Sequence, residues 1–146
     1  MTIRLATSND IPELQEIAVK AYAPYVERMG LEPAPMRPDF AAHIAADTVF
    51  VWDESGVKAY AVVVMGEGEP LLDNIAVDPA TQGQRLGSKL LGHLEAHLRD
   101  EGFSAYTLYT NVHMVENIAW YLRVGFTETG RGTQDRFERV FFRKEL

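Results

Sequence analysis

The chain has 146 residues, 47% hydrophobic and 24% charged, which is typical of a globular protein, so residues 1–146 are expected to form a single domain with one core. The absence of cysteine excludes disulfides, thiolate metal sites and a cysteine nucleophile, and the net charge of −7 disfavours nucleic acid and favours cationic partners. No apolar run approaches the roughly 20 residues of a membrane helix and no basic-then-apolar signal opens the chain, so we expect a cytoplasmic protein with no membrane partner.

The first half of the chain predicts a strand, a helix, a broken segment, a short helix and two further strands. In order, these elements are expected at residues 2–6, from Ser8–Asp10 to Tyr22, 24–38, 40–45, 48–52 and 57–65. Capping residues and Pro12 indicate the start of the first helix. Four prolines and Gly30 interrupt the segment after it, for which we expect one or two helical turns and a loop.

The second half alternates strands and helices and ends in a hairpin. Strands are expected at residues 71–77, 106–109, 126–129 and 137–143, helices at 86–98 and 115–123, and the hairpin turn at 130–134. Gly102 and Gly125 follow the two helices as C-terminal caps. Because a helix joins the first two of these strands, they are predicted to lie parallel in one sheet.

The stretch from Ile75 to Leu91 carries the most specific signal. A glycine-containing loop leaves a strand there and opens a helix, whose first backbone N–H groups lack partners and carry the positive end of the helix dipole. This arrangement predicts an anion-binding site. The stretch is neither a Walker A loop nor a G-x-G-x-x-G fingerprint, and by itself it leaves an ordinary helix start as the alternative.

The same loop resembles the acyl-CoA pyrophosphate motif of the GNAT superfamily of N-acetyltransferases, Gln/Arg-x-x-Gly-x-Gly/Ala. Gln82 and Gly87 match this motif, and Gly83 fits a common variant. Arg85 departs from it, since the family usually has its first motif glycine at that position. Its side chain restricts the backbone, but its guanidinium could pair with a phosphate.

A second stretch, residues 117–126, resembles the helix of the same family that ends in Tyr-x-x-x-Gly-Phe. The resemblance implies that Tyr121 protonates the departing CoA thiolate, a role that suits a phenol, which is protonated at neutral pH. A packed core tyrosine is the alternative. The family often has asparagine seven residues earlier, where this chain has Met114, so whether Asn111 or Asn117 contacts the pantetheine or caps the helix stays open.

The strand before the loop corresponds to the family strand whose backbone pairs with the pantetheine arm. The resemblance implies that Ile75 and Val77 act through backbone atoms and that an amide there polarises the thioester carbonyl. Asp73 alternates onto the same face as these two residues, which makes it the candidate base, with a solvated carboxylate as the alternative. Tyr25 and Glu27 precede the segment that covers the acceptor site in the family and are the candidate substrate contacts.

The resemblance covers nearly the whole chain and implies an α/β (α+β) fold, a GNAT-like single domain. Its mixed, mostly antiparallel sheet of about seven strands would be splayed between the strands ending at Val77 and Thr110 and flanked by about four helices. Acetyl-CoA would lie in the gap. The implied cofactor-binding residues are Ile75, Ala76, Val77, Gln82, Gly83, Gln84, Arg85, Leu86, Gly87, Ser88, Asn111, Met114 and Asn117.

The implied activity is transfer of an acetyl group from acetyl-CoA to a primary amine of a small molecule or peptide. Direct attack in a ternary complex agrees with the absence of cysteine, and no metal is required. A non-catalytic acyl-CoA-binding or sensing module on the same fold is the alternative. A homodimer is one possible assembly, since dimers are common in the family.

Overall fold

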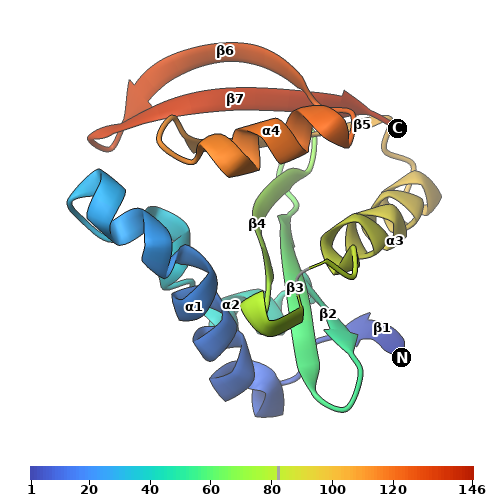
Figure 1. The fold of residues 1–146 in the computed structure, drawn as a ribbon. Coiled ribbons are helices and arrows are strands. Elements are labelled where there is room, and N and C mark those ends of the chain that lie inside the picture. The colour runs from blue at the N-terminus through green and yellow to red at the C-terminus, as the bar shows by residue number, and fades with distance from the viewer. Residues whose placement is uncertain (82) are drawn as a thin grey trace.

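The computed structural model of the chain describes residues 1–81 and 83–146, which form one seven-stranded sheet with helices on both faces (Figure 1). The strands are β1 (Thr2–Leu5), β2 (Val49–Asp53), β3 (Val57–Val64), β4 (Leu71–Val77), β5 (Ala105–Asn111), β6 (Thr127–Gln134) and β7 (Phe137–Glu145). The helices are α1 (Ile11–Met29), α2 (Phe40–Ala45), α3 (Leu86–Asp100) and α4 (Val115–Arg123). None of the helices in this described part is long and apolar enough to cross a membrane.

The strand order is β1-β2-β3-β4-β5-β7-β6, with β4 and β5 parallel and the other neighbours antiparallel. This mixed, mostly antiparallel sheet confirms the predicted fold class. The last strand in the sequence, β7, lies between β5 and β6. The terminal hairpin is therefore joined to the rest of the sheet through β7, its second strand.

The apolar side chains of β2 and β3 point alternately to the two faces of the sheet, and both faces are buried. Phe50 and Trp52 pack with the leucines of α3 in one cluster, while Val49 and Val51 pack with α1 and α2 in a second. Accordingly, α1 and α3 lie on opposite sides of the central strands in Figure 1. The two helical layers hold the strands that carry the site.

The sheet divides between β4 and β5. Among the described residues, these two strands pair only at Leu71 and Thr107, where the Thr107 amide also donates to the Pro70 carbonyl at 2.9 Å. β4 remains paired with β3 from Leu71 to Val77, and β5 remains paired with β7 along its whole length. Each strand is therefore held by its outer neighbour while the two diverge, which confirms the predicted splay.

A β-bulge in β4 lies at Asp73. The register passes from Val62 opposite Asn74 to Val63 opposite Leu72, so Asp73 has no partner in β3. Its Oδ2 lies 3.8 Å from Nε2 of His43 in α2, whereas Ile75 and Val77 pack with the α3 cluster on the other face. The prediction that Asp73 shares their face is wrong because a bulge interrupts the alternation and redirects the side chain.

The first helix extends further than the prolines predicted. α1 runs through Pro24 to Met29 and ends at Gly30, whose φ of 72° places it in the left-handed region. Proline normally interrupts a helix, because it lacks the N–H and meets the carbonyl four residues earlier. Tyr22 and Tyr25 are both buried on either side of it, so packing against the sheet outweighs that penalty. The first part of the segment 24–38, for which one or two helical turns and a loop were predicted, therefore continues α1 to Met29, and the loop begins at residue 30.

The terminal hairpin also turns later than predicted. Residues 130–134 belong to β6, and the turn is formed by Asp135 and Arg136, with φ of 52° and 71°. Two successive left-handed residues match the twist of a two-residue hairpin. The resulting register places Arg139 opposite Asn111 of β5, a position that bears on the site.

Candidate functional site

The divergence of β4 and β5 opens a large cleft of about 930 Å³, within the range of small-molecule and cofactor sites. Three β4 residues, the first turn of α3, α4 and the second half of α1 form its walls. The predicted site residues that line it are Tyr25, Ile75, Ala76, Val77, Gly83, Arg85, Leu86, Gly87, Ser88, Asn117 and Tyr121. The structure thus brings most of the predicted cofactor residues to one opening.

The loop before α3 has the backbone geometry of an anion site. Gly83 has a φ of 90°, and Arg85 caps α3 with φ 59° and ψ 30°, without a side-chain cap hydrogen bond. A left-handed residue at this point lets the chain turn so that the first N–H groups of α3 remain free for a ligand. Arg85 thus adopts a left-handed conformation that glycine takes at lower cost, and it adds a guanidinium at the cleft.

Gln82 and Gln84 are the two remaining predicted residues of this loop. Gln82 lies outside the described residues. Gln84 is exposed and lines neither this cleft nor the smaller cavity described below.

Gly87 of α3 lies against Trp120 of α4. A Cβ at this residue would lie 3.3 Å from Cζ2 of Trp120 and 3.5 Å from Cγ2 of Val77. A larger side chain here would displace Trp120 or project into the cleft. Trp120 itself lines the cleft; the sequence offered only its position beside Tyr121 as a signal for this.

Tyr121 lies where the cleft meets a second cavity. Its ring packs against Phe126 and Phe142, with centroid distances of 5.8 and 5.9 Å, so its position is fixed by the core. Burial raises the pKa of Tyr121 well above its ordinary value. The phenol is therefore protonated at neutral pH.

The second cavity, of about 110 Å³, lies between α1, the segment 33–35 and strands β4, β5 and β7. Tyr22, Asn117 and Tyr121 line both openings. Asp73 lines this small cavity and not the large cleft. The two openings are therefore adjacent, with Tyr121 on their common wall.

Asn111 and Met114, predicted to bind the cofactor, line the small cavity instead of the large cleft. The Asn111 side-chain oxygen accepts a hydrogen bond from the His113 backbone N–H at 2.9 Å, which orders the turn before α4. Met114 occupies the cap position of α4 without a side-chain cap bond. Of the two asparagines left open by the sequence, Asn117 is the one that faces the large cleft.

Hydrogen bonds of Asn74 stabilise the wall between the large cleft and the small cavity. Its side-chain oxygen accepts hydrogen bonds from the hydroxyls of Tyr22 at 2.8 Å and Tyr60 at 3.3 Å, and its nitrogen donates to the Pro35 carbonyl at 2.9 Å. These bonds tie β4 to α1 and to the segment that covers the small cavity. Burial raises the pKa of Tyr22, so this hydroxyl stays a donor. In the sequence Asn74 is one of two adjacent polar residues in an otherwise apolar strand, and this pattern carried no such signal.

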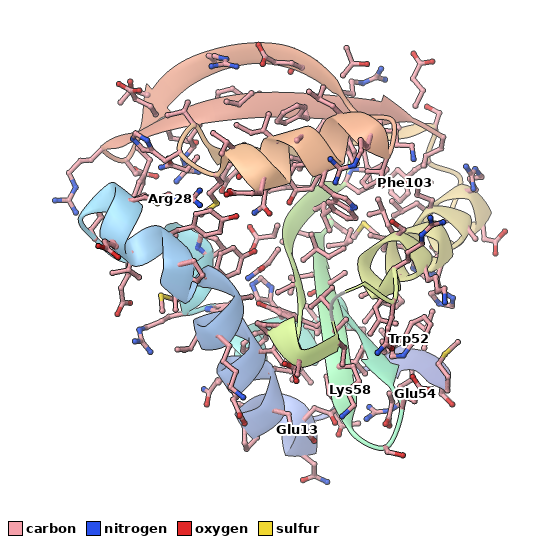
Figure 2. The ribbon with its side chains drawn as sticks, viewed as in Figure 1. Glu13, Arg28, Trp52, Glu54, Lys58 and Phe103 are labelled. Carbon is pink, nitrogen blue, oxygen red and sulfur yellow. The ribbon has the colours of Figure 1, made fainter. Side chains whose placement is uncertain are left out.

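An ion pair spans the mouth of the large cleft from α1 to α4. Both terminal nitrogens of Arg28, labelled in Figure 2, donate to the Glu116 carboxylate, at 2.7 and 2.6 Å. The Tyr25 hydroxyl donates to the same carboxylate at 3.4 Å. Arg28 lowers the pKa of Glu116 to about 2, so the pair persists at neutral pH. Glu27, the other predicted substrate contact, is exposed and lines neither opening.

Known proteins resemble this chain in sequence and in fold. Residues 45–128 match the family model described as acetyltransferase (GNAT) domain. The [ribosomal protein bS18]-alanine N-acetyltransferase of Escherichia coli (strain K12) is 38% identical over 72 residues, which are 49% of this chain and 49% of that protein. The chain thus spans about half the length of the curated relatives it matches.

Solved structures extend the likeness over the whole chain. The ribosomal-protein-S18-alanine N-acetyltransferase from Escherichia coli has a TM-score of 0.76 at 26% identity, over 99% of this chain and 92% of that chain. The PaiA N-acetyltransferase from Thermoplasma acidophilum, solved with coenzyme A, has a TM-score of 0.81 at 14% identity, over 99% and 98%. Because the family model covers more than half of the chain and the splayed sheet agrees with it, the chain belongs to the GNAT acetyltransferase family.

Proposed function

We propose that the protein is an acyl-CoA-dependent N-acetyltransferase that moves an acetyl group from acetyl-CoA to a primary amine, with residues 1–146 acting as one domain. The observation that carries this proposal is the split between β4 and β5, which joins an anion-binding helix start to a buried, protonated tyrosine. Family membership and the coenzyme A complex of a structural neighbour support it.

The large cleft suits acetyl-CoA in both size and polarity. The N–H groups of Leu86, Gly87 and Ser88 and the Arg85 side chain would hold the pyrophosphate, since charge-assisted hydrogen bonds contribute about 1.5–3 kcal/mol each. Such local donors overcome the repulsion expected from the net charge of −7. Within residues 1–81 and 83–146, no strand pairs with β4 on its β5 side beyond Leu71. The backbone of Ile75 and Val77 is therefore free to pair with the pantetheine arm.

Residues where the large cleft meets the small cavity can carry out the acetyl transfer. The amine nitrogen forms a bond to the thioester carbon, backbone N–H groups near Ile75 and Val77 donate to the developing oxyanion, and the carbon–sulfur bond breaks. The amine proton passes to Asp73, directly or through water, and Tyr121 donates a proton to the departing thiolate. The acceptor enters through the small cavity, where Asp73 lies 3.8 Å from His43.

The acceptor class is a small-molecule or peptide amine. The relatives named as ribosomal-protein alanine N-acetyltransferases support an amine as the acceptor. Tyr25, on the cleft wall, and Glu27, the residue before Arg28, remain predicted acceptor contacts on α1.

Binding of acetyl-CoA is tested by calorimetry on the wild type and Gly87→Glu. The glutamate would place bulk and negative charge against Trp120, so we expect micromolar binding in the wild type and none in the variant. Gly92→Glu is the matched control: it adds the same charge to α3, at an exposed residue with nothing within 4 Å of a new Cβ. Equal loss in both variants, or no binding by the wild type, would refute the proposed cofactor site.

The acid role is tested by Tyr121→Phe. Removing the hydroxyl should lower kcat by roughly 10²–10⁴-fold, as for other general acids, and leave the Kd of acetyl-CoA unchanged. Turnover that survives the substitution would exclude Tyr121 as the acid. A protein that binds acetyl-CoA but releases no CoA with any amine of a broad panel would be a binding module instead.

A further inference from the structure

Arg139 is a buried cation on the wall of the small cavity. It is 6% exposed and lines that cavity, and its side-chain hydrogen-bond partner is the Gln134 side-chain oxygen at 3.4 Å. None of the ion pairs in the described part of the chain includes Arg139. A guanidinium has five donors, so most of its hydrogen-bonding capacity is available to a ligand.

Aromatic rings hold Arg139 in place without neutralising it. Its guanidinium carbon lies 4.3 Å from the ring centroid of Tyr109 and 5.5 Å from that of Phe137. Cation–π contacts stabilise a desolvated guanidinium, but they offset only part of the cost of burying a charge without a counter-ion. An anionic ligand would supply the missing charge.

The sheet register directs Arg139 to the acceptor side of the site. Arg139 is three residues from Phe142 on a strand that pairs regularly with β5 between them, so the two side chains lie on opposite faces. Phe142 packs against Tyr121. Arg139 therefore approaches the cavity from the face away from α4, the side from which an acceptor would meet the thioester.

The opposite wall of the same cavity carries a negative charge. The bulge in β4 directs Asp73 into it, and no ion pair joins Asp73 to Arg139 among the described residues. The cavity thus offers a carboxylate on the β4 wall and a guanidinium on the β7 wall. A ligand complementary to both walls carries an amine and an anion.

We propose that the acceptor of this enzyme is a small primary amine that also bears a carboxylate, and that Arg139 binds the carboxylate while Asp73 faces the amine. This inference rests on the proposed function and adds the class of acceptor. Guanidinium pairs with carboxylate in a two-point geometry that lysine does not reproduce. The cavity volume of about 110 Å³ is smaller than the engineered cavity of roughly 150 Å³ that holds benzene, so the ligand is of amino-acid size.

The proposal is tested by comparing acceptors that differ only in the carboxylate. The twenty free amino acids, each paired with its α-amide, are assayed for CoA release with acetyl-CoA, and the tripeptide amide Ala-Ala-Ala-NH2 represents a protein N-terminus. We expect at least one free acid to exceed its amide by tenfold or more in kcat/KM. Isoglutamine and isoasparagine distinguish the two sources of the carboxylate, because each keeps only the side-chain one.

Variants assign the preference to Arg139. Arg139→Gln should lower kcat/KM for the preferred acid by tenfold or more, change that for its amide less than twofold, and leave the Kd of acetyl-CoA unchanged. Arg143→Gln is the matched control, since Arg143 lies on the same strand, pairs with Glu69 at the surface and lines neither opening. Arg139→Lys replaces Arg139→Gln if the latter fails to fold, and the same acid-to-amide ratio should fall.

The outcomes separate this inference from the function it rests on. Amides that lack any carboxylate, or the tripeptide amide, acetylated as well as the free acids would overturn the inference and leave an N-acetyltransferase, and so would an acid-to-amide ratio unchanged in Arg139→Gln. Absence of acetyl-CoA binding, or of CoA release with every amine, would overturn both.

Discussion

Arg85 combines a left-handed backbone with a charged side chain at the start of α3, and two substitutions separate these contributions. Its φ of 59° and ψ of 30° cost a non-glycine residue roughly 1–2 kcal/mol. Arg85→Gly removes that strain but lets the unfolded chain gain freedom equivalent to about 0.5–1 kcal/mol. The net expectation is a gain of about 0.5–1 kcal/mol in the free energy of unfolding, or about 1–4 °C in Tm for a chain of this length.

The same substitution should weaken cofactor binding. Removing one charge-assisted bond to phosphate at an exposed site is expected to raise the Kd of acetyl-CoA about tenfold, which corresponds to about 1.4 kcal/mol. Arg85→Ala is the matched control, because it loses the guanidinium but keeps a Cβ in the left-handed region. It should bind acetyl-CoA as weakly as Arg85→Gly while showing no gain in stability.

Calorimetry for binding and urea denaturation for stability measure the two effects independently. If Arg85→Gly is no more stable than Arg85→Ala, the left-handed backbone carries no strain and the conformational reasoning fails. If both variants bind acetyl-CoA as tightly as the wild type, the guanidinium does not contact the phosphates.

Two further predictions concern stability. In the wild type the buried Glu95 carboxylate lies 2.7 Å from the Lys144 ammonium. Lys144→Ala leaves this carboxylate without its cation and should lower the free energy of unfolding by about 2–3 kcal/mol. A loss below about 1 kcal/mol in urea melts would contradict this expectation. Hydrogen bonds from Arg4 lower the pKa of Asp10, so the stabilisation by Asp10 is complete above its unfolded pKa of about 3.9 and is lost as the pH falls through the lower folded value. Asp10→Asn should flatten the pH dependence of stability below about pH 4, and an unchanged acid limb in melts between about pH 2 and 6 would exclude this group as its cause.

Local patterns in the sequence were sufficient for the elements that carry the family's motifs. The leucines of α3 recur at helical spacing, the following Gly102 has a φ of 92° as a cap requires, and α4 spans the predicted residues 115–123. The strand–helix–strand order from β4 to β5 predicted a parallel pair, and the structure has one. Helical and strand periods are set by neighbours within a few residues, so they can be read without the fold.

Pro24 shows where local signals misled. Its ring favours a helix end, yet α1 continues to Met29 because Tyr22 and Tyr25 are buried on either side. The polar, glycine-containing segment 130–134 favoured a turn, yet pairing with β7 makes it a strand. In both cases contacts from distant parts of the chain outweigh the preference of a few residues.

The sequence by itself determined the order of the elements, the glycine-containing loop before α3 and the place of Tyr121 on α4. Only the tertiary structure decided which side chains meet in the small cavity. A bulge relative to β3 redirects Asp73, and the pairing of β7 with β5 brings Arg139, 66 positions along the chain from it, to the same opening. Strand register depends on pairing between segments far apart in sequence, and shifting it by one residue exchanges the faces of every side chain. No pattern within a single segment contains that information.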